Sequence, residues 1–334
     1  MGSHLTEQFS LGAHVTVIDN LSRPRLFKGR IVSNLDPHYN LKFLRSIPNV
    51  EVIEGDISDQ NTVKEAAKGA ELIIHTAAQV AVTTSLEDPM LDFHVNALGT
   101  LNVLEAARLN DSMLEFCSTN KVYGENVNQL PVREDKTRYS FSDERYVDGV
   151  PETFPVDLTG HSPYGCSKLS ADMYMQDYAH TYGLKTGVFR FSCIYGPRQI
   201  GVEDQGWVAW LTIATLTGKP INIYGDGKQV RDVLYVTDLV EVFRRFAESP
   251  LRHGVFNVGG GPHNTLSLVE LLDMLEEITG KRSELKFKPW RAADQKVYIS
   301  DIRKVENALE WHPRTTPREG VESLVEWVRQ AIVA

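Results

Sequence analysis

The chain has 334 residues, enough to bury a large core in one elaborated domain or two. Hydrophobic residues make up 42% of it and charged residues 24%, proportions that are ordinary for a soluble globular protein. A net charge of −9 without a basic run argues against nucleic-acid binding, and no apolar stretch approaches the roughly 18 residues of a membrane span. Three cysteines without metal-ligand spacing, and a polar start without a signal peptide, predict reduced thiols, no metal site and a cytoplasmic location.

Strand-like apolar runs alternate with helical runs through the first half of the chain. We expect strands at 14–19, 50–56, 72–78, 113–118 and 186–192, and helices at 63–68, 96–107 and after Pro163. This alternation predicts an α/β fold with a parallel sheet covered on both faces.

The second half has a different character and predicts a smaller lid over the carboxyl ends of the strands. We expect helices at 207–216 and 318–333 and a strand at 256–259. Ser267 and Glu270 form a capping-box pattern for a helix to Thr279, closed by Gly280. A long polar insertion at 133–161 contains several aromatic residues, so we interpret it as a contact or functional loop rather than a disordered one.

Tyr164 and Lys168 lie four residues apart just after Pro163, so on a helix they share one face. An ammonium beside a phenol favours the phenolate, so we expect a tyrosine pKa below its usual value near ~10. Such a phenolate can take a proton from a substrate hydroxyl, which suits oxidation of an alcohol by a nicotinamide cofactor. Alone the pattern is weak, and two surface residues are the alternative interpretation. It recurs at Tyr224 and Lys228, where two glycines and an aspartate predict a turn instead.

The start of the chain lacks a feature that dinucleotide-binding folds normally have. Such folds begin with a strand, a glycine-rich turn and a helix that receives the pyrophosphate. Met1-Gly-Ser-His-Leu is typical of the helix after such a turn, with Gly2 as its last glycine, and an expression-tag remnant is the alternative. We therefore expect the first strand and turn to be missing, which would leave a gap in the sheet, destabilise the chain and weaken dinucleotide binding.

Taken together, these motifs resemble the extended short-chain dehydrogenase/reductases of the NAD-dependent nucleotide-sugar epimerase/dehydratase family. The resemblance runs nearly end to end and is carried by Asp19–Arg23, Gly55–Ile57, His75–Gln79, Asn96, Ser118–Gly124, Tyr164–Lys168, Tyr195–Pro197, Tyr224–Asp232 and Tyr235–Asp238. More narrowly, residues 192–199, 203–210 and 149–155 resemble the CDP-paratose (tyvelose) 2-epimerases.

The resemblance implies a Rossmann-type doubly wound parallel sheet in an NAD-binding domain at 1–192, into which residues 133–161 are inserted. A smaller substrate-binding domain at 193–334 follows, with parts such as 236–259 returning to the sheet. It also implies a homodimer or homotetramer.

For catalysis the resemblance implies Thr119, Tyr164 and Lys168. Tyr164 would be the base, Lys168 would tune it and hold the nicotinamide ribose, and Thr119 would hydrogen-bond the reacting oxygen. Asn120 and Lys121 stand where the family's 4,6-dehydratases resemble an acid pair, so dehydration is not expected.

The implied cofactor is NAD. The residues expected to bind it are Gly2, Asp19, Asn20, Arg23, Asp56, Ile57, Ala77, Ala78, Gln79, Asn96, Ser118, Tyr164 and Lys168. A carboxylate at Asp19 would accept both adenosine ribose hydroxyls and favour NAD over NADP, although Arg23 could still accommodate a phosphate. The alternative for Asn96 is a simple helix N-cap.

For the substrate, a nucleotide sugar, the resemblance implies Gln199, Gln205, Trp207, Tyr224, Arg231 and Arg291. Guanidinium groups at Arg231 and Arg291 suit the two adjacent phosphates, and surface salt bridges are the alternative for both. His75 closes an apolar strand, so we interpret it as a core residue.

The activity that the resemblance implies is epimerisation at C2 of a CDP-sugar, CDP-paratose to CDP-tyvelose, through a transient keto-sugar. Two alternatives stay open at this point. The first is a 4-epimerase or another activity of the same family on UDP- or dTDP-sugars, and the second is a non-catalytic NAD-sensing or scaffold relative.

Overall fold

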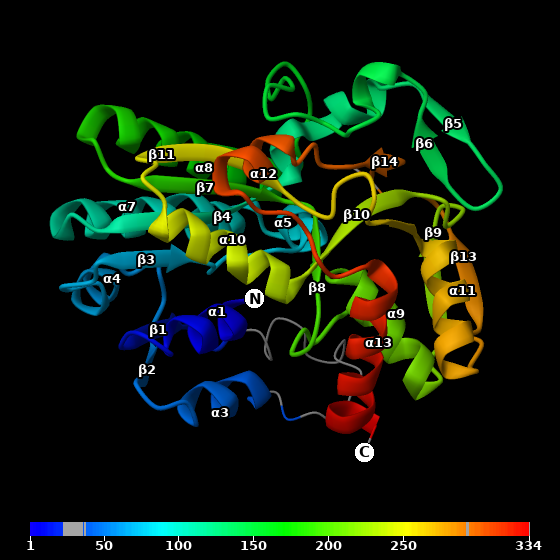
Figure 1. Cartoon of the computed structure of the whole chain (residues 1–334), viewed down its shortest axis with the longest axis horizontal. Helices are drawn as coiled ribbons and strands as arrows, with labels where there is room; N and C mark the ends of the chain where they lie inside the picture. Colours follow the sequence, from blue (N-terminus) through cyan, green and yellow to red (C-terminus); the bar gives the residue numbers. More distant parts are fainter. Residues whose placement is uncertain (23–35, 37, 292–293, 334) are drawn as a thin grey trace.

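The computed structural model describes residues 1–22, 36, 38–291 and 294–333. Its main sheet has four parallel strands in the spatial order β11-β7-β4-β3 (Figure 1). Their bounds are His253–Val258 for β11, Thr186–Phe191 for β7, Met113–Thr119 for β4 and Leu72–His75 for β3. The expected α/β fold with a parallel sheet is confirmed.

A second parallel pair, β1 (Val15–Asp19) and β2 (Val50–Glu54), is separate from the main sheet (Figure 1). Within the part of the chain that the structure describes, no strand pairs with both β1 and β3. The side chains of β1 are half-buried or exposed, whereas every residue of β7 is buried. The sheet is thus interrupted between β1 and β3, where the sequence analysis expects a gap.

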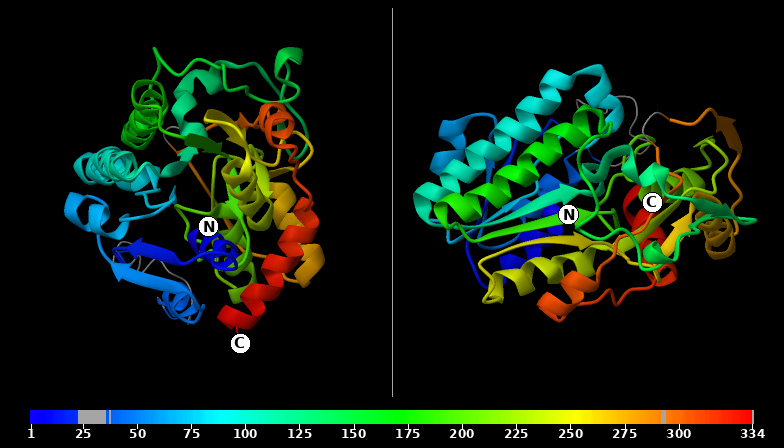
Figure 2. Two further views of the ribbon diagram at one scale, coloured as in Figure 1. Left: turned by 60° about the vertical axis from the view of Figure 1, so that its left-hand side comes forward. Right: turned by 90° about the horizontal axis from the view of Figure 1, so that it is seen from above.

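Helices cover both faces of the main sheet (Figure 2). On one face α4 (Gln60–Ala66), α7 (Gly99–Asn110) and α8 (Ser162–Tyr182) pack around Leu104, Phe116 and Met175. On the other face α1 (Gly2–Phe9), α10 (Val236–Glu248) and α12 (Arg303–Leu309) pack around Phe189, Phe243 and Phe246. Leu, Phe and Met side chains buried on both faces give the sheet its hydrophobic stabilisation.

The remaining helices are α3 (Tyr39–Arg45), α5 (Val82–Glu87), α6 (Pro89–Phe93), the π-helix η1 (His94–Leu98), the 3₁₀ segments η2 (Asn120–Gln129) and η3 (Glu144–Tyr146), α9 (Trp207–Thr217), α11 (Leu268–Thr279), α13 (Pro317–Val328) and η4 (Arg329–Val333). Among these, α9, α11 and α13 with η4 lie where the sequence analysis expects helices, whereas α3, α5, α6, η2 and η3 were not expected. The capping box of Ser267 and Glu270 is formed, and Gly280 ends α11 with a left-handed φ of 68°. Both features of α11 are confirmed.

The second half builds smaller sheets beside the carboxyl ends of the main strands. β10 (Val230–Tyr235) pairs with β8 (Cys193–Tyr195), β12 (Thr265–Ser267) and β14 (Val297–Tyr298), and β9 (Ile221–Tyr224) pairs with β13 (Leu285–Lys288). α10 and β11 return to the main sheet, as expected for 236–259. Gly225 and Gly227 have positive φ angles of 84° and 81°, which confirms the expected turn after Tyr224.

The insertion at 133–161 makes ordered contacts with the second half. It contains the hairpin of β5 (Val132–Glu134) and β6 (Tyr139–Phe141). Arg138 forms an ion pair with Glu270 at 2.6 Å, and the Tyr139 hydroxyl donates to Asp226 at 2.5 Å. Its interpretation as a contact loop is confirmed.

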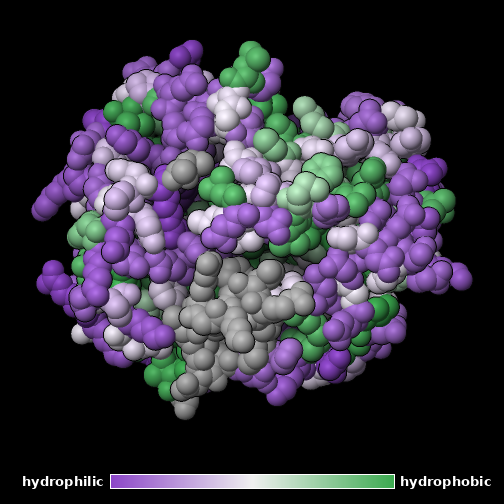
Figure 3. All heavy atoms as spheres, turned by 180° about the vertical axis from the view of Figure 1, so that it is seen from behind, coloured by the Kyte–Doolittle hydropathy of each residue, from purple (hydrophilic) through white to green (hydrophobic). Residues whose placement is uncertain are grey.

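The surface is largely hydrophilic, with scattered apolar side chains on the face drawn in Figure 3. Among the described residues, no helix is both long enough and apolar enough to cross a bilayer. Cys117, Cys166 and Cys193 are all unpaired thiols, as their spacing predicts.

The aromatic cluster beneath β7 generates a stability prediction. Phe189 is fully buried, and its ring centroid lies 4.9 Å from that of Phe243 and 5.6 Å from that of Phe246. We expect Phe189→Ala to lower the free energy of unfolding by about 3–5 kcal/mol, because it removes buried apolar area and leaves a cavity. Phe287→Ala is the matched control: Phe287 is 62% exposed, and its loss should change stability by less than about 0.5 kcal/mol. Denaturant titrations would contradict this account if both variants unfolded at the same midpoint.

Candidate active site

The carboxyl ends of β3, β4 and β7 and the first turns of α8 surround a cavity of about 250 Å³. Parallel strands bring their carboxyl ends to one edge of the sheet, so residues far apart in sequence meet there. The cavity is lined by all three residues expected to be catalytic, Thr119, Tyr164 and Lys168. Three of the expected substrate residues, Gln199, Gln205 and Trp207, line it from the opposite side.

Tyr164 and Lys168 both point into the fold from α8, as the four-residue spacing predicts. Tyr164 is 9% exposed and Lys168 is 3% exposed. The Lys168 ammonium donates to the Cys117 carbonyl oxygen at 2.7 Å and lies 4.0 Å from the centre of the Phe116 ring. The alternative interpretation, two surface helix residues, is therefore wrong.

The expected lowering of the Tyr164 pKa is also wrong for this structure. Burial raises the pKa of Tyr164 to about 12, and the hydrogen bond with Thr119 opposes that rise only in part. Burial likewise lowers the pKa of Lys168 to about 8, while the nearby Cys117, Asp172 and Asp92 act in the opposite direction. Burial disfavours the charged form of both groups, and for both it is the largest cause of the shift.

Ser118 and Thr119, at the end of β4, have different neighbours. The Ser118 hydroxyl donates to Asp172 Oδ2 at 2.6 Å, and Asp172 also forms a buried ion pair with Arg190 at 3.0 Å. The Thr119 hydroxyl hydrogen-bonds Tyr164 and accepts from the Lys121 backbone N–H at 3.2 Å. Thr119 therefore faces Tyr164, whereas Ser118 links β4 to α8 through Asp172.

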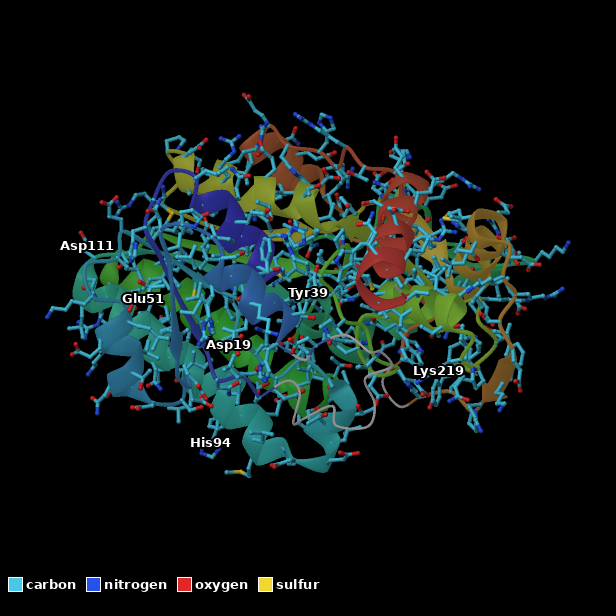
Figure 4. All side chains as sticks on the ribbon, turned by 90° about the horizontal axis from the view of Figure 1, so that it is seen from below. Asp19, Tyr39, Glu51, His94, Asp111 and Lys219 are labelled. Carbon is cyan, nitrogen blue, oxygen red and sulfur yellow. The ribbon has the colours of Figure 1, made fainter. Side chains whose placement is uncertain are left out.

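The residues expected to bind the adenosine end lie at the carboxyl ends of β1 and β2. Asp19 is the exposed last residue of β1 and is labelled in Figure 4. Asn20 Nδ2 donates to Asp56 Oδ2 at 2.8 Å. Partial burial would raise the pKa of Asp56, but hydrogen bonds from Asn20 and Ser58 outweigh it and lower the pKa. Arg23 lies outside the described residues.

Small residues follow β3 where a cofactor would need space. Ala78 lines the cavity, while Ala77 packs against the core together with Ile57. A Cβ added to Gly2 would make an ordinary van der Waals contact with the Thr76 hydroxyl, at 3.4 Å, so Gly2 lies directly beside the end of β3. These positions permit close approach of backbone and ligand, as the sequence analysis expects.

Gln79 and Asn96 bind each other rather than lining the cavity. Asn96 Nδ2 donates to the Gln79 carbonyl at 3.0 Å, and the Gln79 N–H donates to Asn96 Oδ1 at 2.9 Å. Asn96 lies inside the π-helix η1 rather than at a helix N-cap, so the N-cap alternative is wrong. A direct contact of either side chain with NAD stays a prediction.

On the substrate side, Gln199 Nε2 donates to the Ile194 carbonyl at 3.2 Å. This leaves Gln199 Oε1 as a buried acceptor without a protein partner, and Gln205 Oε1 is in the same state. Trp207 Nε1 is held 3.1 Å from Cys193 Sγ, and Cys193 also lines the cavity. Two buried acceptors at a cavity wall suit hydroxyl or amino donors on a ligand.

Tyr224 and Arg291 form a second cluster that does not line this cavity. The Arg291 guanidinium lies 3.8 Å from the centre of the Tyr224 ring and pairs with Asp204 at 3.0 Å. The Tyr224 hydroxyl donates to Glu203 Oε1 at 2.7 Å.

Arg231 is 11% exposed through its side chain and pairs with Asp294 at 2.7 Å. Both arginines form salt bridges, as the alternative interpretation has it, Arg231 with Asp294 and Arg291 with Asp204. Binding of a diphosphate by either guanidinium stays a prediction.

His75 is a core residue, as interpreted from sequence. It is 4% exposed, its Nε2 lies 2.9 Å from the Thr100 hydroxyl, and burial lowers its pKa to about 3. In the described residues no group of three or more His, Cys, Asp or Glu side chains could hold a metal ion.

Sequence reasoning missed the buried polar residues that support the site. Asp172 and Arg190 lie on α8 and β7 and pair across the interior, and Asp92 lies on α6 beneath α8. The one local signal was spacing: Asp172 follows Lys168 by four residues, and Asp92 precedes Asn96 by four.

Comparisons with known proteins agree with this architecture. The sequence profile of the GDP-mannose 4,6 dehydratase family matches residues 1–324. The chain is 41% identical to a CDP-paratose 2-epimerase of Salmonella typhi, over 98% of this chain and 96% of that protein. Among solved structures, the UDP-glucose 4-epimerase of Thermotoga maritima with UDP-glucose has a TM-score of 0.79 at 31% identity, covering 98% of this chain and 95% of its own. The UDP-glucose 4-epimerase of Thermus thermophilus in complex with NAD has a TM-score of 0.77 at 31% identity, covering 99% and 96%.

The buried ion pair behind the cavity generates the second prediction. Asp172 is fully buried and accepts hydrogen bonds from both Arg190 and Ser118. We expect Asp172→Asn to lower the free energy of unfolding by about 3–5 kcal/mol, because Arg190 would remain buried without a counter-charge. Asp177→Asn, on the exposed side of the same helix, removes the same charge and should change stability by less than about 0.5 kcal/mol. Equal unfolding midpoints for the two variants would rule out a structural role for the pair.

Proposed function

The chain belongs to the extended short-chain dehydrogenase/reductase family of nucleotide-sugar epimerases and dehydratases, and on that premise we propose that it is an NAD-dependent epimerase inverting C2 of a CDP-linked dideoxyhexose. The observation that carries the proposal is the cavity itself. Thr119, Tyr164 and Lys168 meet at one wall, and Gln199 and Gln205 offer buried acceptors at the other.

The residues at the carboxyl ends of the strands fit NAD. Asp19 is an exposed carboxylate at the end of β1, suited to ribose hydroxyls, and hydrogen bonds from Asn20 and Ser58 lower the pKa of Asp56 against the effect of burial. The small residues Gly2 and Ala78 leave room at the sheet edge. When bound, NAD accepts a hydride from the sugar carbon and returns it.

The chain's own residues handle the proton and the oxygen. In the proposed reaction the Tyr164 oxygen takes the proton from the substrate hydroxyl as the carbon–hydrogen bond breaks, which leaves a keto-sugar. The proton goes back to the oxygen when the hydride returns to the opposite face of C2, so nothing is consumed. Thr119 donates to the same oxygen and stabilises the charge that develops on it.

The high pKa of Tyr164 in the protein alone is compatible with this role. Burial is the largest cause of the rise, and burial makes the phenol sensitive to any charge placed nearby. The oxidised nicotinamide ring and the Lys168 ammonium are both positive, and positive charge favours the phenolate. Tyr164 would therefore become a base when cofactor and substrate are both in place.

Epimerisation is favoured over dehydration by the residues after Thr119. Asn120 and Lys121 offer an amide and an amine, so they cannot supply the acid pair that elimination of water needs. The choice of CDP and of C2 is supported by the 41% identity to the Salmonella typhi protein, against 31% for the UDP-glucose 4-epimerases. A UDP-sugar 4-epimerase is the second candidate, because those structures align over nearly the whole chain.

Replacing the base tests the mechanism. We expect Tyr164→Phe to reduce kcat by about 10²–10⁴-fold while NAD binding is retained, since only the ionisable oxygen is lost. Tyr174→Phe is the matched control, because Tyr174 lies on the same helix with 45% of its surface exposed. Steady-state turnover and NAD titration on both variants decide the outcome, and near-wild-type turnover by Tyr164→Phe would refute the assignment.

Isotope labelling tests the substrate and the carbon. We expect CDP-paratose to be turned over faster than UDP-glucose or UDP-glucuronate, and deuterium at its C2 to slow the reaction and remain in the product. Retention follows because the hydride stays within the protein between removal and return. Product analysis by mass spectrometry and NMR would count against the proposal if the label exchanged with water, or if only C4 deuterium slowed turnover.

A further inference from the structure

Asp92, on α6, is a buried carboxyl group that the proposed chemistry does not use. It is 1% exposed. Its Oδ2 accepts from the Ser167 hydroxyl at 2.5 Å. Its Oδ1 accepts from Gln79 Nε2 at 2.7 Å and from Asn96 Nδ2 at 3.0 Å. Three donors on one carboxyl group suit its ionised form, which accepts only.

Two of the three partners of Asp92, Ser167 and Gln79, belong to segments that border the cavity. Ser167 stands between Tyr164 and Lys168 on α8, and its hydroxyl also contacts the Tyr164 carbonyl at 3.1 Å. Gln79 directly follows Ala78, a residue of the cavity wall. One carboxylate thus ties the catalytic helix to the loop after β3.

The π-helix η1 makes this arrangement possible. Asn96 lies within it and exchanges two hydrogen bonds with the backbone of Gln79 while its amide also reaches Asp92. Gln79 Oε1 in turn accepts from the Ala81 N–H at 2.6 Å, so the loop is held from both sides. Single π-turns inside helices are frequently found at functional sites, where they reorient side chains.

Asp92 also acts electrostatically on the reacting pair. Its negative charge raises the pKa of Lys168 and that of Tyr164. Burial raises the pKa of Asp92 itself, against the hydrogen bonds from Ser167 and Gln79 and the positive charge of Lys168. The other ionisable groups acting on Lys168 are Cys117 of β4 and Asp172 of α8.

We propose that Asp92 is a positioning residue for the Tyr164–Lys168 pair, which it orients through its contacts with Ser167, Gln79 and Asn96. It does not line the cavity, so it acts through its neighbours. The proposal rests on the family's epimerase reaction but not on the identity of the sugar.

Two substitutions distinguish the effect of losing the hydrogen bonds of Asp92 from the effect of losing its negative charge. In Asp92→Asn the remaining oxygen can still accept from Gln79 and Asn96, and the new amide can donate to Ser167, whose own hydroxyl can turn to the Tyr164 carbonyl. The negative charge alone is lost. Asp92→Ala removes all three contacts. Asp88→Asn is the matched control, because Asp88 is an exposed N-cap four residues earlier and an asparagine keeps that cap.

The experiment measures kcat against pH on CDP-paratose, UDP-glucose and UDP-glucuronate, using whichever substrate the wild type turns over, together with NAD affinity and melting temperature. We expect both limbs of the pH profile of Asp92→Asn to move to lower pH by about half a unit or more. Without the negative charge Tyr164 ionises at lower pH, which moves the acid limb, and Lys168 loses its proton at lower pH, which moves the alkaline limb. We expect Asp92→Ala to lower kcat by about 10- to 100-fold through misplacement of the pair, with weaker NAD binding.

The outcomes separate this proposal from a purely structural role and from the proposed function. A lower melting temperature in both Asp92 variants, with wild-type kcat, pH limbs and NAD affinity, would overturn the positioning role. A profile shift in Asp88→Asn equal to that in Asp92→Asn would overturn it as well. Failure of the wild type on CDP-paratose but not on a UDP-sugar would overturn the CDP assignment and leave the Asp92 test intact. If the wild type turned over none of the three, unchanged NAD affinity in Asp92→Ala would still refute the proposal.

Discussion

The packing of α8 against β4 and β7 is the constraint on which the active-site geometry depends. It is secured by the buried pair of Asp172 and Arg190, and by the Ser118 hydroxyl that donates to the same carboxylate. Because Ser118 is followed at once by Thr119, this contact places the hydroxyl of β4 beside the phenol of α8. A shift of α8 along the sheet would break the ion pair between Asp172 and Arg190, and the same shift would separate Thr119 from Tyr164.

Burial changes the pKa values of both Tyr164 and Lys168. It raises the pKa of Tyr164 to about 12 and lowers the pKa of Lys168 to about 8. In the protein alone the phenol therefore favours its neutral form. In surroundings of low polarity the pKa values of Tyr164 and Lys168 respond strongly to a new positive charge. In the proposed reaction a bound positive charge therefore favours the ionised form of the Tyr164 phenol.

The insertion at 133–161 holds the second half of the chain through an ion pair and hydrogen bonds, in addition to the packing of that half against the main sheet. Arg138 of the insertion pairs with Glu270, and Ser267 donates to the Thr137 carbonyl, so the hairpin is attached to the start of α11. Tyr139 holds Asp226 in the turn that leads into β10. β10 carries Arg231, and its partner β8 carries Cys193 at the cavity wall, so the hairpin stabilises the frame of the expected substrate side.

The sequence by itself determined the alternation of strands and helices, the capping box at Ser267 and the shared face of Tyr164 and Lys168. These depend on periodicity and on contacts a few residues apart, which local patterns encode directly.

Only the tertiary structure decided what surrounds each group. The pKa of Tyr164 rises instead of falling because of burial, which is a property of the whole fold, and the hydrogen bond with Thr119 opposes that rise only in part. Asn96 is a partner of Gln79 rather than the helix cap of the alternative interpretation, because η1 brings it beside the loop after β3. Asp92, Asp172 and Arg190 carry no local signature, since the partners that make them matter lie on other elements and meet them only when the sheet and helices pack.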